Sequence, residues 1–122
     1  MSDPIYQDII LEHYRNPQNT GRLSAPESSV AVSNPLCGDS ITVDLRMDKG
    51  RISEIKYEAL GCAISVASMS LLSEDLRGKT KQEVAKLKKE YVLTLLGISL
   101  SPNRLKCALL SLEAVQKAVK NI

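Results

Sequence analysis

The sequence predicts an α+β domain in which a three-stranded antiparallel sheet is followed by helices. Residues 40–47 and 51–59 alternate between apolar and polar side chains, which is the period of strands that bury one face. Residues 62–72 contain no charge and many small side chains, a composition typical of a helix buried on most sides. Because 122 residues suffice for one modest core, we expect residues 1–122 to form a single domain.

A helix is expected near the start of the chain. Ser2 or Asp3 can cap this helix, and Pro4 suits its first position. The helix should end before Pro17, because the residue that precedes a proline avoids the helical region. Residues 16–29 are rich in Pro, Gly, Ser and Asn, which predicts a surface loop.

The sheet is expected to be a meander. A short strand around residues 30–32 precedes the second strand, residues 40–47, and an Asp-Lys-Gly turn leads into the third. Ile52 is out of phase with the later apolar positions of the third strand. This shift indicates a bulge near Ser53.

The second half of the chain predicts three more helical segments. Gly78 should end the buried helix, and Thr80 can cap a highly charged one. Residues 91–100 are apolar, and we expect a short helix and a loop around Gly97. Ser101, followed by a proline, begins the last helix. The apolar stripe of this last helix consists of Leu105, Ala108, Leu109, Leu112, Val115 and Val119.

Most charges are expected to lie in solvent. Asp44 and Glu58 occupy outward strand positions. The basic stretch Lys79–Lys89 contains Glu83 and is followed by Glu90, as a solvated helix face would be. The net charge is only +2, and a nucleic-acid-binding protein usually has a strong basic patch. We therefore expect no nucleic acid among its partners.

Location and redox state follow from composition. The chain has no apolar run long enough to span a bilayer and no basic start with an apolar run, so we expect no membrane and a cytoplasmic location. In a reducing compartment, three cysteines are not expected to form a disulfide framework. Their thiols are then available for metal binding or catalysis.

Each cysteine lies at an informative position. Cys37 falls in a loop between two strands, followed by a glycine that allows close backbone approach. Cys62 falls at the junction of strand and helix, where a helix N-terminus favours a thiolate. Cys107 lies at the edge of the apolar stripe of the last helix, beside Lys106, whose charge could stabilise a thiolate further.

The spacing of the cysteines leaves their role open. Three thiolates and one carboxylate have the ligand count of a tetrahedral metal site, and thiolates favour zinc or iron–sulfur chemistry. However, no Cys-x-x-Cys pair is present, and the cysteines are separated by 25 and then 45 positions. Buried, inert cysteines are an equally good interpretation. We expect His13, the only histidine, to be structural, and Ser65 and Ser68 to be small packing residues.

Four segments in register resemble a known family. They are His-Tyr-Arg-Asn-Pro-Gln-Asn-Thr-Gly at 13–21, Asn-Pro-Leu-Cys-Gly-Asp at 34–39, Gly-Cys-Ala-Ile-Ser-Val-Ala-Ser at 61–68 and Ser-Pro-Asn-Arg-Leu-Lys-Cys-Ala-Leu-Leu at 101–110. Together they resemble the IscU/SufU/NifU N-terminal family of iron–sulfur cluster assembly scaffolds, over nearly the whole chain. The resemblance implies an antiparallel sheet with helices packed on one face.

The resemblance also implies a site and a function. Cys37, Cys62 and Cys107 would hold a transient two-iron, two-sulfur cluster, or zinc in its place. Asp39 would either serve as a further ligand or keep the cluster labile. The chain would be a scaffold, not an enzyme: it would accept sulfur from a cysteine desulfurase and pass the cluster to apo-proteins. Cys107 is a candidate persulfide acceptor, with Cys37 as the alternative.

The branch within this family stays open. The IscU branch has histidine where this chain has Lys106, and a chaperone-binding Leu-Pro-Pro-Val-Lys segment where this chain has residues 100–104. The last motif is closer to the SufU branch, yet that branch has an insertion between its second and third cysteines that this chain lacks. One alternative is therefore a zinc-dependent sulfur-transfer partner of a SufS-type desulfurase. A plain structural zinc module is the other.

The role of Lys106 and Arg104 has two interpretations. Three thiolates and Asp39 would leave a zinc site with a net negative charge, which these two cations could offset. An ordinary solvent-facing position for Lys106 is an equally good interpretation.

Overall fold

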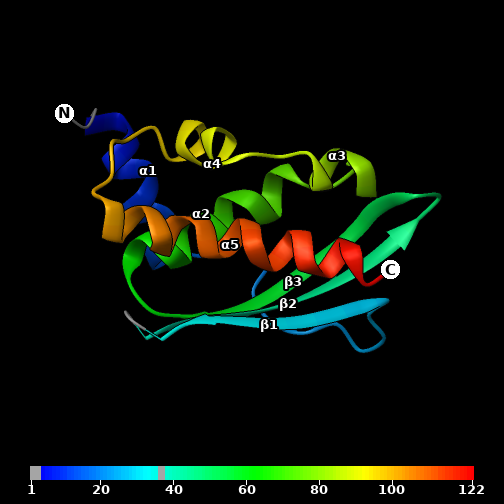
Figure 1. Ribbon diagram of the computed structural model, residues 1–122. Helices are drawn as coiled ribbons and strands as arrows, with labels where there is room; N and C mark the ends of the chain where they lie inside the picture. The colour runs from blue at the N-terminus through cyan, green and yellow to red at the C-terminus, as the bar shows by residue number, and fades with distance from the viewer. Residues whose placement is uncertain (1–3, 36–37) are drawn as a thin grey trace.

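The computed structural model describes residues 4–35 and 38–122. One helix precedes a three-stranded sheet, and four helices follow it (Figure 1). In chain order the elements are α1 (Pro4–Arg15), β1 (Ser28–Asn34), β2 (Asp39–Asp48), β3 (Arg51–Leu60), α2 (Ala63–Asp75), α3 (Lys81–Ala85), α4 (Lys89–Leu96) and α5 (Pro102–Lys120). The proposed caps Ser2 and Asp3 lie outside the described residues.

The sheet is the predicted antiparallel meander, with strand order β1-β2-β3. Val43 on β2 pairs with Val30 on β1 and with Tyr57 on β3. The register of β2 and β3 shifts after Arg46, because Arg46 pairs with Glu54 whereas the next residue pairs with Ile52. Ser53 is therefore the extra residue, and the predicted bulge is confirmed.

The helices cover one face of the sheet, as the fold class predicts (Figure 1). Helix α5 lies against β1 and β2, α2 lies against β3 and α5, and α1 packs on α2. The sheet side of the core is completely enclosed: Val43, Leu45, Ile55 and Tyr57 are all 0% exposed. Alternation along β2 and β3 thus places every second side chain under the helices, where these apolar side chains are removed from water.

The segment between α1 and β1 runs along the sheet rather than away from it. Gly21 N donates to Tyr57 O at 2.8 Å, and Tyr57 N donates to Asn19 O at 3.2 Å, so this segment pairs with the edge of β3 that β2 does not occupy. Glu27 N then donates to Leu45 O at 2.8 Å, next to the start of β1. The predicted loop therefore protects a sheet edge.

Our expectation that Asp44 is a solvated charge is wrong, because this segment covers it. Asp44 is 0% exposed and accepts hydrogen bonds from Arg22 Nε at 2.9 Å, Leu23 N at 3.0 Å and Ser29 Oγ at 2.6 Å. Burial alone would raise the pKa of the Asp44 carboxyl, but the hydrogen bonds from Arg22, Ser29 and Leu23 hold this pKa below its ordinary value. Glu58 is exposed, as predicted.

His13 has a structural role, as predicted. Its Nδ1 lies 2.7 Å from Ser70 Oγ on α2, and Gln18 N donates to the same oxygen at 2.9 Å. Asn19 Nδ2 donates to Ser73 Oγ at 3.0 Å, one turn further along α2. The motif at 13–21 therefore joins α1 and the following segment to buried serines of α2.

The predicted charged helix is shorter than we expected. Thr80 begins α3 with a complete capping box, but α3 has only five residues, and the chain is extended again at Lys88 before α4. The break lets Val84 and Val92 both reach the core. Helix α4 ends at Gly97, whose left-handed φ of 68° confirms the predicted loop there.

No helix in the described part of the chain is both long enough and apolar enough to cross a membrane.

Candidate metal centre

Three of the four predicted ligand residues meet at one end of the molecule. Asp39 is the first residue of β2, Cys62 is the N-cap of α2, and Cys107 lies in the second turn of α5. The Asp39 carboxylate oxygen and the two Sγ atoms all lie within 4.8 Å of one another. Cys37 is two positions before Asp39 in the sequence and lies outside the described residues.

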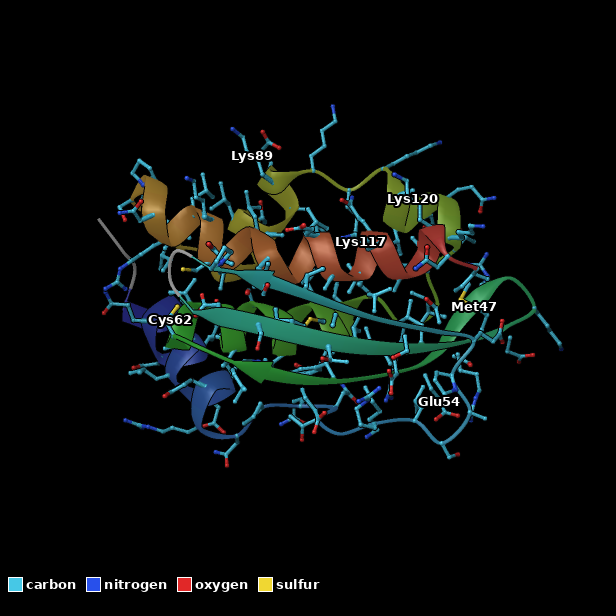
Figure 2. All side chains as sticks on the ribbon, turned by 60° about the horizontal axis from the view of Figure 1, so that its bottom comes forward. Met47, Glu54, Cys62, Lys89, Lys117 and Lys120 are labelled. Atoms are coloured by element: carbon cyan, nitrogen blue, oxygen red, sulfur yellow. The ribbon has the colours of Figure 1, made fainter. Side chains whose placement is uncertain are left out.

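Figure 2 shows Cys62 at the end of the sheet opposite Met47 and Glu54. The hairpin between β2 and β3 is at the Met47 end, so the site lies where β3 leaves the sheet for α2. Helix α5 begins at the same end and brings Cys107 from a distant part of the sequence. The convergence is therefore a property of helix packing on the sheet.

Gly61, which follows β3, allows the backbone to pass close to the Asp39 side chain. Its φ is +143°, which L side chains rarely adopt, and a Cβ built there would collide with Asp39 Oδ1. The residue before Cys62 must therefore be glycine for Asp39 to reach the start of α2.

Asp39 is a buried carboxylate held by the N-terminus of α2. It is 1% exposed, and its Oδ1 accepts a hydrogen bond from Cys62 N at 3.1 Å. The Cys62 side chain makes no capping hydrogen bond of its own, so Asp39 takes the place of a capping side chain. The helix N-terminus stabilises a negative charge at this position.

Ser65 belongs to the site, which our sequence interpretation as a packing residue missed. It is buried as expected, but its Oγ donates to Asp39 Oδ2 at 2.5 Å and lies 3.2 Å from Cys107 O. Its Oγ also lies 3.7 Å from Cys62 Sγ. The available signal in the sequence was the i, i+3 spacing from Cys62, which places both residues on one face of a helix.

The two thiols differ in exposure but share one groove. Cys62 is exposed, whereas Cys107 is 6% exposed. Both line an open groove of about 800 Å³ between α1, the start of α2 and the start of α5. Its apolar lining consists of Ile10, Leu11, Ala63, Ile64, Ile98 and Leu100.

The two cations considered for the site, Arg104 and Lys106, differ in their position relative to the groove. Arg104 lines the groove together with both cysteines. Lys106 is exposed and is not among the residues that line this groove. The solvent-facing interpretation of Lys106 therefore agrees with the structure, and of the two cations it is Arg104 that lines the groove.

The donor set fits zinc or an iron–sulfur unit. Thiolates favour both over magnesium or calcium, and a carboxylate is a harder, weaker partner for iron–sulfur units. Ligands around a tetrahedral zinc lie about 3.8 Å apart when its bonds to sulfur are about 2.3 Å long. The donor atoms here lie within 4.8 Å of one another, so only small side-chain movements separate them from such an arrangement.

Comparison with known proteins finds relatives that are named for iron–sulfur cluster assembly and for zinc-dependent sulfur transfer. The iron–sulfur cluster assembly scaffold protein IscU 1 of Archaeoglobus fulgidus is 32% identical over 115 residues, covering 94% of this chain and 74% of that protein. The zinc-dependent sulfurtransferase SufU of Bacillus subtilis is 34% identical, covering 96% of this chain and 90% of that protein. The alignment with SufU spans 134 positions, more than the 122 residues of this chain, so that relative contains inserted residues.

Solved structures agree with the fold. The crystal structure of the N-terminal part of a nitrogen-fixing NifU-like protein from Brucella abortus superposes with a TM-score of 0.79 at 27% identity, covering 97% of this chain and 94% of that one. Residues 5–122 match the family described as the NifU-like N-terminal domain. With that match and relatives at 32% and 34% identity along nearly the whole chain, this chain belongs to the NifU-like N-terminal domain family.

Proposed function

We propose that this chain is an iron–sulfur cluster assembly scaffold. It accepts sulfur from a cysteine desulfurase, assembles a labile two-iron, two-sulfur cluster and passes this cargo to apo-proteins. The observation that supports this most is the meeting of two thiols and one buried carboxylate, within 4.8 Å of one another, beside an open groove. Scaffold proteins named IscU among its relatives support the same function.

The three cysteines and Asp39 would have different roles in holding and releasing the cluster. Cys62 is exposed, so a donor or acceptor protein can reach it directly, whereas Cys107 forms the inner wall of the groove. Cys37 is proposed as the third thiolate from the sequence alone. Asp39 completes the set as an oxygen ligand, and its weaker bond favours release over permanent storage.

As a scaffold, the chain is a carrier. Residues 1–122 are taken as one scaffold domain, without a chemical turnover of its own apart from accepting sulfur. A cytoplasmic location fits thiols that must stay reduced. The partners are then a cysteine desulfurase and apo iron–sulfur proteins, and neither nucleic acid nor a membrane.

Anaerobic reconstitution with iron and sulfide tests this function. The wild type should bind about two iron and two sulfide per cluster and show visible charge-transfer absorption. Replacing Cys37, Cys62 or Cys107 by Ser should abolish this absorption, and Asp39→Ala should change cluster lifetime, whereas Asp48→Ala, at an exposed position, should not. A wild type that takes up no cluster, or a triple serine variant with the same yield, contradicts the scaffold function.

A second candidate is zinc-dependent sulfur transfer to this chain from a SufS-type desulfurase. The donor set fits zinc, and a relative named as a zinc-dependent sulfurtransferase is 34% identical. The Cys107 thiolate would attack the outer sulfur of the desulfurase persulfide. The S–S bond of the donor breaks, a new one forms on Cys107, and the donor cysteine leaves as a thiolate. Cys37 is the alternative acceptor.

Desulfurase kinetics distinguish the two candidates. If sulfur transfer is the function, the zinc-loaded chain should stimulate sulfide release by a SufS-type desulfurase, and mass spectrometry should find the persulfide on Cys107 or Cys37. Absence of both effects would leave the scaffold function. A purely structural zinc site is less well supported, because Cys62 is exposed and lines an open groove.

A further inference from the structure

One buried hydroxyl contacts all three described residues of the candidate metal centre. Ser65 Oγ donates to Asp39 Oδ2 at 2.5 Å, lies 3.7 Å from Cys62 Sγ and lies 3.2 Å from the Cys107 carbonyl oxygen. Ser65 is 0% exposed and Asp39 is 1% exposed, so water does not compete for this hydrogen bond. A charge-assisted bond of this length between buried groups is a strong one.

This arrangement distinguishes Ser65 from the next buried serine of the same helix. Ser68 is 1% exposed, but its Oγ donates to the backbone carbonyl of Ser65 at 3.1 Å, inside α2. Such a bond to a helix carbonyl is what a buried serine usually makes. Ser65 instead directs its proton out of the helix to a carboxylate on β2.

The Ser65 hydrogen bond is compatible with metal binding by Asp39. A carboxylate has about four lone-pair sites, two on each oxygen. Cys62 N occupies one site on Oδ1, and Ser65 Oγ occupies one site on Oδ2. Cys62 Sγ also donates to Oδ2, at 3.8 Å, but a cysteine that binds a metal gives up this proton, so the Ser65 bond can persist when Asp39 and Cys62 bind a metal together.

We propose that Ser65 is a positioning residue that orients Asp39 as a metal ligand. This inference rests on the proposed function, because it takes Asp39, Cys62 and Cys107 as metal-binding residues. Without the hydroxyl, the carboxylate loses the short hydrogen bond that ties Oδ2 to α2, and its orientation towards the two thiols is less restrained. Loss of such an outer partner typically lowers metal affinity by about tenfold or more.

Zinc affinity measured by competition with a chromophoric chelator tests the inference without any activity assay. The proteins are the wild type, Ser65→Ala, Ser68→Ala, Asp39→Ala and the double variant Asp39→Ala/Ser65→Ala. Ser65→Ala should bind zinc about tenfold more weakly and release it faster, whereas Ser68→Ala should match the wild type. In the Asp39→Ala background, Ser65→Ala should change the affinity by less than about twofold, because its effect passes through Asp39.

Three results would overturn the inference. The first is an unchanged zinc affinity in Ser65→Ala. The second is an equal loss in Ser65→Ala and Ser68→Ala, which would indicate general damage to α2; thermal melts of the apo-proteins identify such damage. The third is a full, additive loss in the double variant, which would mean that Ser65 acts independently of Asp39, through its contact with Cys62 or Cys107. A wild type that binds no zinc would contradict the metal site itself. If the wild type binds zinc, the variants test only the role of Ser65.

Discussion

Arg22 and Asp44 form an ion pair that joins the segment before β1 to the central strand. Arg22 Nε lies 2.9 Å from Asp44 Oδ2, and the Asp44 side chain is 0% exposed while that of Arg22 is 50% exposed. The pair is therefore buried on one side only. The carboxylate depends on its partners, whereas the guanidinium could be solvated without it.

Arg22→Ala should destabilise the fold. The change leaves a buried carboxylate with the Ser29 and Leu23 donors but no counter-charge, and we expect the free energy of unfolding to fall by about 1–3 kcal/mol. Arg51→Ala is the matched control, because Arg51 and Glu83 lie 3.6 Å apart with side chains 60% and 52% exposed. Exposed pairs contribute about 0–1 kcal/mol. Urea unfolding of both variants measures the difference, and equal effects would contradict the role of the pair.

Asp44 should also make stability depend on pH in the acid range. The folded-state pKa of Asp44 is lower than its ordinary value of 3.8, so its contribution is fully present above that value. It is lost as the pH falls through 3.8 towards the folded-state pKa. Unfolding free energies of the wild type and Asp44→Asn, measured from pH 6 down to about pH 3, should therefore converge at the acid end. A constant difference over this range would show that Asp44 does not titrate as the structure indicates.

Gly61→Ala should damage both the fold and the candidate metal centre. The new methyl group would collide with the Asp39 carboxylate, and the φ of +143° adds backbone strain of about 1–3 kcal/mol. Gly50→Ala is the control, because Gly50 has a φ of +78° but no atom within 4 Å of the added Cβ. We expect zinc affinity to fall in Gly61→Ala and to stay unchanged in Gly50→Ala. Equal affinities in the two variants would contradict the close approach of Asp39.

The two described thiols should differ in their rate of alkylation. Cys62 is exposed and Cys107 is 6% exposed, so in the wild type iodoacetamide should label Cys62 before Cys107. Peptide mapping by mass spectrometry over time separates the two sites. Zinc should slow labelling of both, and its removal by a chelator should restore the original rates. Protection of neither thiol by zinc would indicate that they do not share a metal.

The sequence by itself determined the features that depend on neighbours along the chain. The alternation of β2 and β3, the bulge at Ser53 and the cap at Thr80 all follow from local periods and local hydrogen bonds. The position of Cys62 at the start of α2 follows in the same way, since Gly61 marks the change of period. The candidate ligands came from motifs in register, and Cys37 among them stays a prediction.

Only the tertiary structure decided which outward side chains are covered. Alternation places Asp44 on the outer face of the sheet, but the segment that buries it comes from 22 residues earlier in the chain, at Arg22. Likewise, a helical period makes Ser65 a buried residue, but its partner Asp39 lies 26 residues away on another element. Contacts of this kind arise because packing brings distant segments together, and a local pattern contains no information about what packs against it.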